Sequence, residues 1–273
     1  MEDHKVFAVI VTYKRAEILS QCLDAVLKRS TYKISKLHII VNSNDEETLG
    51  VINKFKYEYG EIISYTKFDN CGPAGGFYYG IKEAVTSHCD SVWLMDDDLI
   101  PEPKCLERLL QAAKIHPYVF PRVFKGNGEE VISFGWWGVL LSIDLIKKVG
   151  LPMKEFFYWT EDTEYLQNRL IRKNKILPYR SKEAIVKHYH FRTTLHPAWY
   201  YYYTIRNTIY YRLNLFPLNF TGFWKLLNQI AISNYTILVK EDHKRNKLYY
   251  LYLGMFHGVK GSLGKLEKLH RTT

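Results

Sequence analysis

Apolar segments of strand length alternate with amphipathic segments of helix length through the first hundred residues of the chain. The segments expected to form strands are 6–12, 37–41, 62–66 and 91–95. The segments expected to form helices between them are 16–28, 47–59 and 77–87. Continuous apolar strands joined by helices are buried on both faces, so they form a mostly parallel sheet. The sequence therefore predicts an α/β fold whose first half is Rossmann-like.

Three consecutive carboxylates follow the fourth predicted strand directly. Asp96, Asp97 and Asp98 repel one another, so a fold tolerates them where solvent or a cation relieves the repulsion. The apolar run 92–95 ties them to the rim of the sheet, where open α/β sheets bind their ligands. A solvated acidic turn is the simpler interpretation. The position nevertheless favours a site for a divalent cation and a diphosphate.

A glycine-rich stretch lies between the third predicted strand and the helix that follows it. Residues 70–77 read Asn-Cys-Gly-Pro-Ala-Gly-Gly-Phe. Glycines let the backbone approach a ligand closely, and the N-terminus of the next helix attracts phosphate or sugar oxygens. The stretch lacks the spacing of a dinucleotide site and the Lys-Ser/Thr pair of a P-loop. On its own it favours a tight strand-to-helix turn.

The 273-residue chain is long enough for one domain with a helical extension. We expect an α/β region over 1–198 and a helical, aromatic and basic region over 199–273. The segment 216–239 is long enough to span a bilayer, but polar amides interrupt it, so we expect a packed or interfacial helix. The four cysteines form no CxxC pair and no signal peptide is recognisable, which favours a reducing cytoplasm over a disulfide framework or a zinc site.

The formal net charge of +10 is concentrated toward the end of the chain. Residues 212–273 contain ten Lys or Arg and three Asp or Glu. These basic residues are interleaved with apolar runs, which favours an anionic membrane surface, and no recognised motif supports nucleic-acid binding. We therefore expect a cytoplasmic protein that lies peripherally on the inner face of the cell membrane. The aromatic helices of this region could also form a homodimer interface.

The order of the motifs resembles that of the family-2 nucleotide-sugar glycosyltransferases, which are inverting enzymes of the GT-A fold. Within that family the chain looks most like the bacterial galactofuranosyl- and rhamnosyltransferases. The resemblance covers roughly residues 6–215. The motifs that carry it are 9–13 with Arg15, Asn70-x-Gly72-x-Ala74-Gly75-Gly76-Phe77 with Gly80, the three aspartates, Val149-Gly150-Leu151 to Phe156-Phe157, Glu161-Asp162-Thr163-Glu164-Tyr165 and Tyr203-x-x-Arg206-Asn207.

The resemblance implies a donor site built from several segments. The residues that would line the nucleotide pocket, or contact the donor sugar and its diphosphate, are Thr12, Tyr13, Arg15, Asn70, Gly75, Gly76, Asp96 and Asp97. Asp96 would lie nearer the ribose. Asn42 is included in this site, but it stands where the family usually has an aspartate that reads the base. Base recognition is therefore left open.

The resemblance also implies the groups that carry the reaction. Asp98 would bind Mn²⁺ or Mg²⁺ directly. His188, or its rival His190, would complete the coordination, and an imidazole ligand would favour Mn²⁺. Asp162 would be the catalytic base that removes the proton of the acceptor hydroxyl. The acids of its motif also have a structural interpretation, because acids in the first turn of a helix suit the helix dipole.

Aromatic and charged residues near these positions are candidates for the acceptor side. Trp136, Trp137 and Trp159 could stack on a sugar, although packing in the core is an equal alternative for them. Glu161 lies beside the predicted base. Arg206 lies in an aromatic helix, where its charge requires an anionic partner, either an internal carboxylate or the phosphate of the acceptor.

These expectations combine into one function and three alternatives. We expect inverting, metal-dependent transfer of galactofuranose from UDP-galactofuranose to a lipid-linked glycan, in the synthesis of a cell-surface polysaccharide such as capsule or O-antigen. The first alternative is transfer of rhamnose from dTDP-rhamnose, although the acidic triplet is closer to that of galactofuranosyl enzymes. A nucleotidyltransferase is disfavoured because the loop 12–16 has no glycine. A non-catalytic membrane scaffold is the third alternative.

Overall fold

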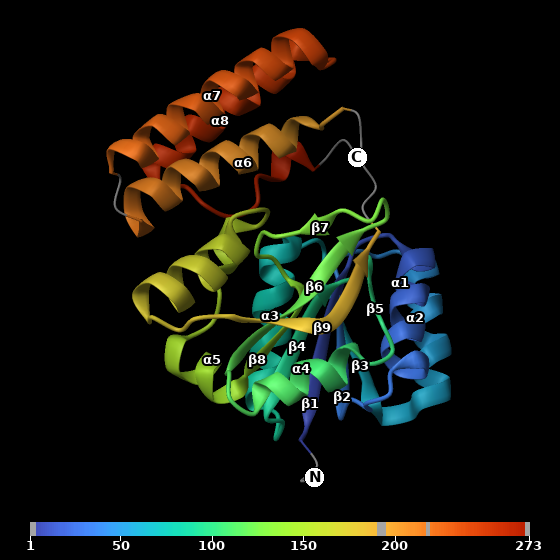
Figure 1. The fold of residues 1–273 in the computed structure, drawn as a ribbon. Coiled ribbons are helices and arrows are strands. Elements are labelled where there is room, and N and C mark those ends of the chain that lie inside the picture. The colour runs from blue at the N-terminus through green and yellow to red at the C-terminus, as the bar shows by residue number, and fades with distance from the viewer. Residues whose placement is uncertain (1–3, 190–194, 217–218, 271–273) are drawn as a thin grey trace.

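The computed structural model describes residues 4–189, 195–216 and 219–270. Nine strands among these residues form one sheet in the order β3-β2-β1-β4-β8-β6-β9-β5, and β7 also pairs with β6 (Figure 1). The strands are β1 (Val6–Thr12), β2 (Lys36–Val41), β3 (Ile63–Lys67), β4 (Ser91–Asp96), β5 (Leu99–Pro101), β6 (Tyr118–Lys125), β7 (Glu130–Val131), β8 (Trp137–Ser142) and β9 (Tyr179–His188).

Helices cover the faces of the sheet and lie above one of its edges (Figure 1). They are α1 (Ala16–Asp24), α2 (Glu46–Tyr59), α3 (Gly72–Thr86), α4 (Cys105–Ala113), α5 (Ile143–Val149), α6 (Ala198–Tyr210), α7 (Phe220–Lys240) and α8 (Lys244–Lys260). π-Helical turns extend α1 through Ala25–Arg29 and α6 through Tyr211–Leu215, and a longer π-helical segment covers Thr163–Lys173. The predicted α/β fold is confirmed.

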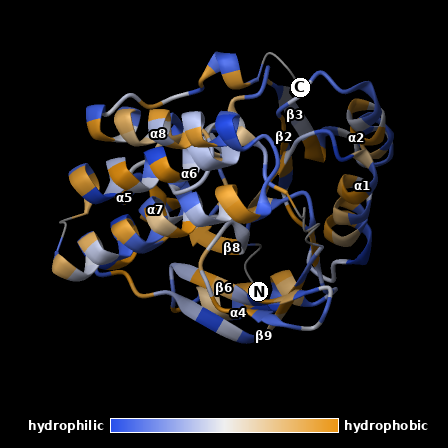
Figure 2. Cartoon of the chain, turned by 90° about the horizontal axis from the view of Figure 1, so that it is seen from above, coloured by the Kyte–Doolittle hydropathy of each residue, from blue (hydrophilic) through white to orange (hydrophobic). Residues whose placement is uncertain are grey.

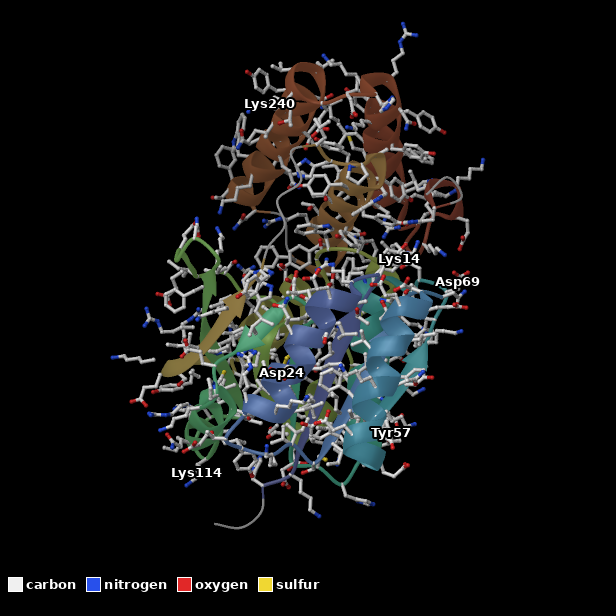
Figure 3. The ribbon with its side chains drawn as sticks, turned by 90° about the vertical axis from the view of Figure 1, so that its right-hand side faces the viewer. Lys14, Asp24, Tyr57, Asp69, Lys114 and Lys240 are labelled. Atoms are coloured by element: carbon white, nitrogen blue, oxygen red, sulfur yellow. The ribbon has the colours of Figure 1, made fainter. Side chains whose placement is uncertain are left out.

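The first half of the sheet is parallel, as the sequence predicts. β1 pairs in parallel with β2 and β4, and β2 pairs in parallel with β3. β8 is antiparallel to β4 and β6, β9 is parallel to β6, and β5 is antiparallel to β9. The carboxyl ends of β1 to β4 therefore lie at one edge, where open sheets of this class bind ligands. Figure 3 places Lys14 and Asp69, which follow β1 and β3, at the boundary between this edge and the helices above it.

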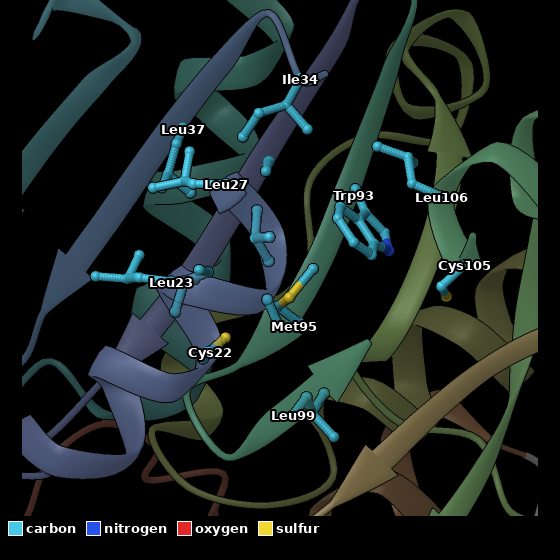
Figure 4. Close-up of a cluster of buried hydrophobic side chains, with 14 of the residues drawn as sticks. Cys22, Leu23, Leu27, Ile34, Leu37, Trp93, Met95, Leu99, Cys105 and Leu106 are labelled. Carbon is cyan, nitrogen blue, oxygen red and sulfur yellow. The ribbon is translucent and has the colours of Figure 1, made fainter. Parts of the chain in front are cut away.

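Alternate side chains of the strands build one apolar core on each face of the sheet. In β1, Ala8 and Ile10 belong to a cluster with Leu23 of α1, whereas Val9 belongs to a cluster with Phe77 of α3. Figure 4 shows the first cluster, which joins α1, β4 and α4. Full burial of one large apolar side chain contributes about 1.5–3 kcal/mol. The two cores therefore hold the strand ends in a fixed arrangement.

Helix α3 begins at Gly72, so the prediction that the glycine-rich stretch is a loop before a helix at residue 77 is wrong. Pro73 occupies the first turn, where its missing N–H leaves no helical hydrogen bond unmade. A Cβ at Gly76 would lie 2.6 Å from Val11 Cγ1. A Cβ at Gly75 would lie 2.8 Å from the side chain of the residue before the helix. Gly76 thus allows close packing of α3 on β1, whereas Gly75 leaves room for the side chain of Cys71.

Helices α6, α7 and α8 form a layer above the carboxyl edge of the strands (Figures 1 and 3). α8 approaches α6 closely, because a Cβ at Gly254 would lie 2.6 Å from the Tyr202 carbonyl oxygen. α7 is held more loosely, since only Gly222 and Ile237 of its 21 residues are buried. Hydrophobic and hydrophilic residues alternate along it (Figure 2). Every described helix is too short or too polar to cross a membrane.

Candidate active site

The carboxyl ends of β1 and β4 bring several of the predicted donor-site residues together. Thr12 Oγ1 donates a hydrogen bond to Asp97 Oδ2 at 2.6 Å. Arg15 Nη1 donates to Asp97 Oδ1 at 3.1 Å and to Asp98 Oδ2 at 2.7 Å. One cation therefore offsets part of the charge of the acidic triplet. Tyr13 is 43% exposed beside this group and offers its ring to a ligand.

Strand register places Asp98 beside His188. Leu99 of β5 pairs with His188 of β9, and the backbone N–H of Tyr189 donates to the Asp98 carbonyl oxygen at 2.9 Å. As a result, His188 Nε2 lies 3.4 Å from Asp98 Oδ1. That oxygen is buried and accepts no hydrogen bond of standard geometry from the described residues.

This pair of atoms fits a divalent cation. Two ligand atoms at neighbouring positions of an octahedral ion lie about 3 Å apart, close to the separation found here. A carboxylate oxygen together with an imidazole nitrogen suits Mn²⁺. Across the described residues no cluster of three His, Cys, Asp or Glu side chains is found, so a substrate diphosphate and water would fill the other positions. The rival ligand His190 lies outside the described residues.

The three aspartates differ in their affinity for protons. Burial and the charges of Asp98 and Asp97 raise the pKa of Asp96 well above its usual value. Burial raises the pKa of Asp97 to about 6, against the opposing charge of Arg15. Burial also opposes ionisation of Asp98, but His188 and Arg15 outweigh it and hold the pKa of Asp98 below its usual value. Asp98 is therefore the most firmly ionised member of the triplet.

The side chain of Asn42 makes hydrogen bonds within the protein and is not available to a ligand. It is buried at the end of β2. Its Nδ2 donates to the Gly72 carbonyl oxygen at 3.0 Å, and its Oδ1 accepts from the backbone N–H of Cys71 at 3.3 Å. Both ends of the amide are used to hold the turn that leads into α3. This geometry contradicts the interpretation of Asn42 as a residue that contacts the donor base.

The N-terminus of α3 supports a segment that is distant in the sequence. Gly72 has φ +69°, and a Cβ there would lie 2.0 Å from the carbonyl oxygen of Phe157. The same oxygen accepts a hydrogen bond from the Ala74 N–H at 3.3 Å. Asn70, also with positive φ (49°), accepts from the Gly72 N–H through its Oδ1 at 3.2 Å. Only glycine fits at position 72, because any larger residue would push the two segments apart.

The loop that carries the predicted base is strained. Phe157, Trp159 and Thr160 have φ values of 63°, 67° and 78°, although none of them is glycine. Such a backbone costs about 1–3 kcal/mol per residue and is concentrated at functional sites. Asp162 follows, and its Oδ1 accepts from the Thr163 N–H at 2.5 Å. Asp162 thus also supplies the side-chain cap of the helical segment that follows.

Glu161 and Asp162 both have raised pKa values. Burial and the charge of Asp162 raise the pKa of Glu161 to about 8. Burial raises the pKa of Asp162 to about 6, although hydrogen bonds from Thr163 oppose the change. Glu161 therefore keeps its proton to higher pH than Asp162 does. An ionised carboxylate beside a neutral one is suited to accept a proton from a substrate.

The other residues of this acidic motif serve the fold. Glu164 is buried and accepts two hydrogen bonds from Arg169, at 2.7 and 3.1 Å. Arg169 also donates to the Leu151 carbonyl oxygen, and the Tyr165 hydroxyl donates to the Gly150 carbonyl oxygen at 2.8 Å. These contacts fix the π-helical segment against the turn after α5. The structural interpretation of the acids therefore holds for Glu164.

Two adjacent residues of α6, which we call the α6 clamp (Arg206 and Asn207), hold the segment 156–162. We call this segment the catalytic loop, after the predicted base Asp162 that it carries. Asn207 Nδ2 lies within hydrogen-bond distance of the carbonyl oxygens of Phe156, Tyr158 and Trp159, at 2.9, 2.7 and 3.0 Å. Arg206 Nη2 donates to the Phe156 carbonyl oxygen at 2.7 Å. Its Nε donates to Asn207 Oδ1 at 2.8 Å, which orients the amide. The position of the loop thus depends on the C-terminal helices.

Arg206 does not have the partner that was predicted for it. It has no exposed surface, and its remaining Nη1 donates to the Gly264 carbonyl oxygen. Its guanidinium also lies 4.8 Å from the ring centroid of Tyr203. Carbonyl dipoles and an aromatic face replace the expected carboxylate or phosphate. The prediction that Arg206 binds the acceptor is therefore wrong.

Replacing Asn207 by alanine should release the catalytic loop. The change removes the donor to three carbonyl groups and the acceptor of Arg206 Nε, and each lost hydrogen bond of this kind costs about 1–3 kcal/mol. We expect the Tm to fall by about 5–10 °C and kcat to fall by about 10²-fold. Thermal melts and steady-state kinetics measure the two effects. Asn214→Ala is the control, because Asn214 is exposed and bonds only its own helix among the described contacts. Equal results for both variants would contradict the clamp.

The three predicted stacking residues differ in exposure. Trp136 is buried and stacks on Phe77 with 4.7 Å between ring centroids, so the prediction that it binds the acceptor is wrong. Trp137 is half-buried beside the candidate metal ligands. Trp159 is 47% exposed and meets the ring of Tyr200 edge-on at 5.8 Å. Of the three, Trp159 offers the largest free surface to a sugar.

Two residues with a place in this site were not predicted. One is Asn207, whose motif was recognised without a role being assigned to it. The other is Tyr158, whose pKa burial raises to about 12. Its hydroxyl interacts electrostatically with Asp96 of the triplet and with Glu161 of the catalytic loop. Its position in an aromatic run indicated packing as much as binding.

Comparisons with known sequences agree with this arrangement. Residues 7–195 match the family model described as "Glycosyl transferase family 2". The chain is 34% identical over 212 residues to the galactofuranosyltransferase GlfT1 of Mycolicibacterium smegmatis, which covers 64% of this chain and 67% of that protein. It is 30% identical over 115 residues to the glucosyl-dolichyl phosphate glucuronosyltransferase of Haloferax volcanii, covering 41% of this chain and 35% of the relative.

Solved structures share the fold. TarS 1–349 of S. aureus superposes with a TM-score of 0.58 at 12% identity, covering 93% of this chain and 81% of that one. GalNAc-T7 with UDP, GalNAc and Mn²⁺ superposes with a TM-score of 0.59 at 12% identity, covering 69% of this chain and 44% of that one. At this level of identity the likeness concerns the fold.

Proposed function

Because the chain belongs to glycosyl transferase family 2, we propose that it transfers galactofuranose from UDP-galactofuranose, with inversion, to a lipid-linked glycan of a cell-surface polysaccharide. The chain is a glycosyltransferase with the GT-A fold. The galactofuranosyltransferase that is 34% identical to it supports the choice of sugar. The observation that supports the chemistry is the contact between the loop before Asp162 and the start of α3 at the carboxyl edge of the sheet, where the Ala74 N–H donates to the Phe157 carbonyl oxygen at 3.3 Å.

On the donor side, the diphosphate is proposed to lie at Asp98 and His188. These two residues would hold a Mn²⁺ or Mg²⁺ ion, which when bound stabilises the charge that develops on the leaving diphosphate. Arg15 adds a fixed positive charge at the same rim, since Asp97 and Asp98 hold its guanidinium. Tyr13 offers an exposed ring to the nucleotide.

On the acceptor side, Asp162 is proposed to take the proton of the attacking hydroxyl. Attack from the face opposite the diphosphate displaces it in a single step and inverts the anomeric centre. Burial and the charge of Asp162 raise the pKa of Glu161 above that of Asp162, so Asp162 is the carboxyl that ionises first and accepts the proton. Trp159, exposed at the same loop, would stack on the acceptor sugar and orient its hydroxyl.

The proposed location is the inner face of the cell membrane. Phe220, Trp224 and Leu238 on one side of α7 are 77%, 55% and 52% exposed. Exposed lysines, Lys240 and Lys244, lie at the adjoining helix ends. An apolar helix face near lysines suits an anionic membrane interface. A relative named for glucosyl-dolichyl phosphate is consistent with a lipid-linked acceptor. The alternative to membrane binding is that the same face of α7 is buried in a homodimer interface.

The family assignment narrows the alternatives. The nucleotidyltransferase and the non-catalytic scaffold give way to a glycosyltransferase. Transfer of rhamnose from dTDP-rhamnose would use the same carboxylates with another donor. The two donors differ in the base and the sugar, so direct binding distinguishes them.

Thermal stabilisation by sugar nucleotides tests the proposal. Ligand at 100 times its Kd adds about 2.7 kcal/mol of stability by mass action, which raises the Tm of a chain of this size by about 5 °C. We expect this shift with UDP and UDP-galactofuranose in the presence of Mn²⁺, and a much smaller one with EDTA. A shift with dTDP-rhamnose alone would replace the proposed donor. No shift with any nucleotide would contradict the proposal.

A further inference from the structure

A cleft of about 280 Å³ opens between α6 and α7, next to the candidate active site. Its lining includes Tyr200, Thr204, Lys225, Asn228, Gln229 and Ser233. Gln229 Nε2 reaches across to the hydroxyl of Thr208 on α6, at 3.4 Å. Since α7 buries so little of its own surface, a space persists between the two helices. No part of the mechanism above uses this cleft.

The lining of the cleft is mixed, with polar groups and one positive charge beside Tyr200, Tyr201 and Ile232. Thr204 and Ser233 contribute hydroxyls, Asn228 and Gln229 contribute amides, and Lys225 contributes an ammonium group. The lining residues include no carboxylate. Thr204 Oγ1 is buried and has no hydrogen-bond partner among the described residues. Hydroxyls and amides bind sugar hydroxyls, and a single ammonium group binds a phosphate.

α7 packs on α6 and α8 through Ile237, Leu226 and Ile230, and it carries a second apolar side that is exposed. The exposed side, which we call the α7 outer face, consists of Phe220, Trp224, Leu227, Tyr235 and Leu238. These positions fall on one side of the helix, because their offsets are close to multiples of 3.6 residues. The cleft side of α7 holds the polar residues instead. One helix therefore offers polar groups to a cleft and apolar groups beside it, which fits an amphiphilic ligand.

The cleft connects to the acceptor side of the active site. Tyr200 lines the cleft, and its ring meets that of Trp159 at 5.8 Å. Trp159 lies three residues before the proposed base Asp162. The other aromatic residue of this wall, Tyr201, donates its hydroxyl to Glu241, which is already paired with Lys247. A glycan that stacks on Trp159 can therefore continue into the cleft without meeting an unpaired carboxylate on that wall.

We propose that the α6–α7 cleft binds the phosphate-bearing end of the lipid-linked acceptor, with Lys225 on the phosphate and with Thr204 and Asn228 on the adjoining sugar. The lipid chain then leaves along the α7 outer face. This inference rests on the proposed function, because it assigns a second subsite to the same acceptor. It places recognition of the lipid-linked end away from the reacting hydroxyl.

Binding of farnesyl phosphate to the purified full-length chain tests this subsite without any turnover. We expect measurable affinity by isothermal titration calorimetry, and no comparable affinity for octyl β-galactoside, which lacks the phosphate. Lys225→Gln should weaken farnesyl phosphate binding by at least about tenfold, the effect of one charge-assisted hydrogen bond. Thr204→Val keeps the size of the side chain and should weaken binding of a farnesyl-phosphate-linked sugar by about threefold or more.

Lys114→Gln is the control, because Lys114 is an exposed lysine at the end of α4 and does not line the cleft. Equal losses in Lys225→Gln and Lys114→Gln would show that farnesyl phosphate binds to basic residues in general and would overturn the subsite. Failure of the wild-type chain to bind farnesyl phosphate would overturn it too. The UDP-dependent Tm shift, measured on the same proteins, tests the proposed function separately, since the cleft variants should leave it unchanged.

Discussion

Replacing Asp162 by asparagine is expected to lower kcat by about 10³-fold while leaving the Kd for UDP within about twofold. The amide keeps the size of the side chain but cannot accept the proton of the attacking hydroxyl. Asp162 lies on the catalytic loop and not among the groups that surround Asp98, so donor binding should survive. Radiolabelled transfer assays and calorimetric titration with UDP measure the two quantities.

The pH profile provides an independent check on the same residue. Burial raises the pKa of Asp162 to about 6, and a base must be ionised to act. Below pH 6 we therefore expect kcat/KM to fall about tenfold per pH unit, and above it to level off. This acidic limb should be missing from the residual activity of Asp162→Asn. The control is Asp144→Asn, an exposed acid in the first turn of α5, which should keep the wild-type profile. Full activity in Asp162→Asn would exclude the residue as the base.

Removing the carboxylate of Asp98 is expected to abolish metal-dependent donor binding. Asp98 Oδ1 is the buried oxygen that faces His188, so Asp98→Ala leaves a single protein ligand at this position. Loss of a ligating group should weaken binding of the cation by about 100-fold or more, a larger effect than loss of a supporting residue. UDP affinity in Mn²⁺ should then fall to the value that the wild-type chain shows in EDTA.

Two control variants distinguish loss of metal binding from general disruption of the carboxyl edge of the sheet. Asp69→Asn changes an exposed acid at the same edge of the sheet and should keep Mn²⁺-dependent binding. Asp98→Asn keeps a hydrogen-bond acceptor for Arg15 and should preserve the Tm better than Asp98→Ala, yet it should still lose most of the metal dependence. Normal Mn²⁺-dependent UDP affinity in Asp98→Ala would refute the assignment of Asp98 as a ligand.

The parallel half of the sheet and its acidic rim could be predicted because both follow from local order in the sequence. The continuous apolar run before Asp96 predicts a buried strand, and the helical spacing of apolar residues in the segments around it predicts helices that cover the sheet. The choice between His188 and His190 could not be predicted, because residues two apart on a strand point to the same face. The pairing of Leu99 with His188 places His188 beside Asp98.

Side chains whose partners come from distant segments were the ones that sequence reasoning misjudged. Asn42 occupies a strand end like a ligand-binding residue, but the turn before α3 uses both ends of its amide. Arg206 appeared to require an anion, since a sequence shows charges and does not show which backbone carbonyls fold around them. For Trp136 the sequence did not distinguish stacking on a sugar from packing in the core. Its stacking on Phe77 shows that it packs in the core. The start of α3 was predicted too late because glycine has a low helix propensity. The structure uses a glycine inside this helix because α3 lies very close to β1.

The α6 clamp limits how independently the two parts of this chain can evolve. Composition divides the chain near residue 198, and a chimera that joined residues 1–198 to the helices of a relative would seem a reasonable way to change acceptor preference. The backbone of Phe156, Tyr158 and Trp159 is nevertheless held by Asn207, beyond that division. Substitutions that reshape the helical layer are therefore expected to move Asp162, the proposed base, as well. Acceptor range and catalytic geometry are inherited together, and successful grafts will have to carry the loop with the helices.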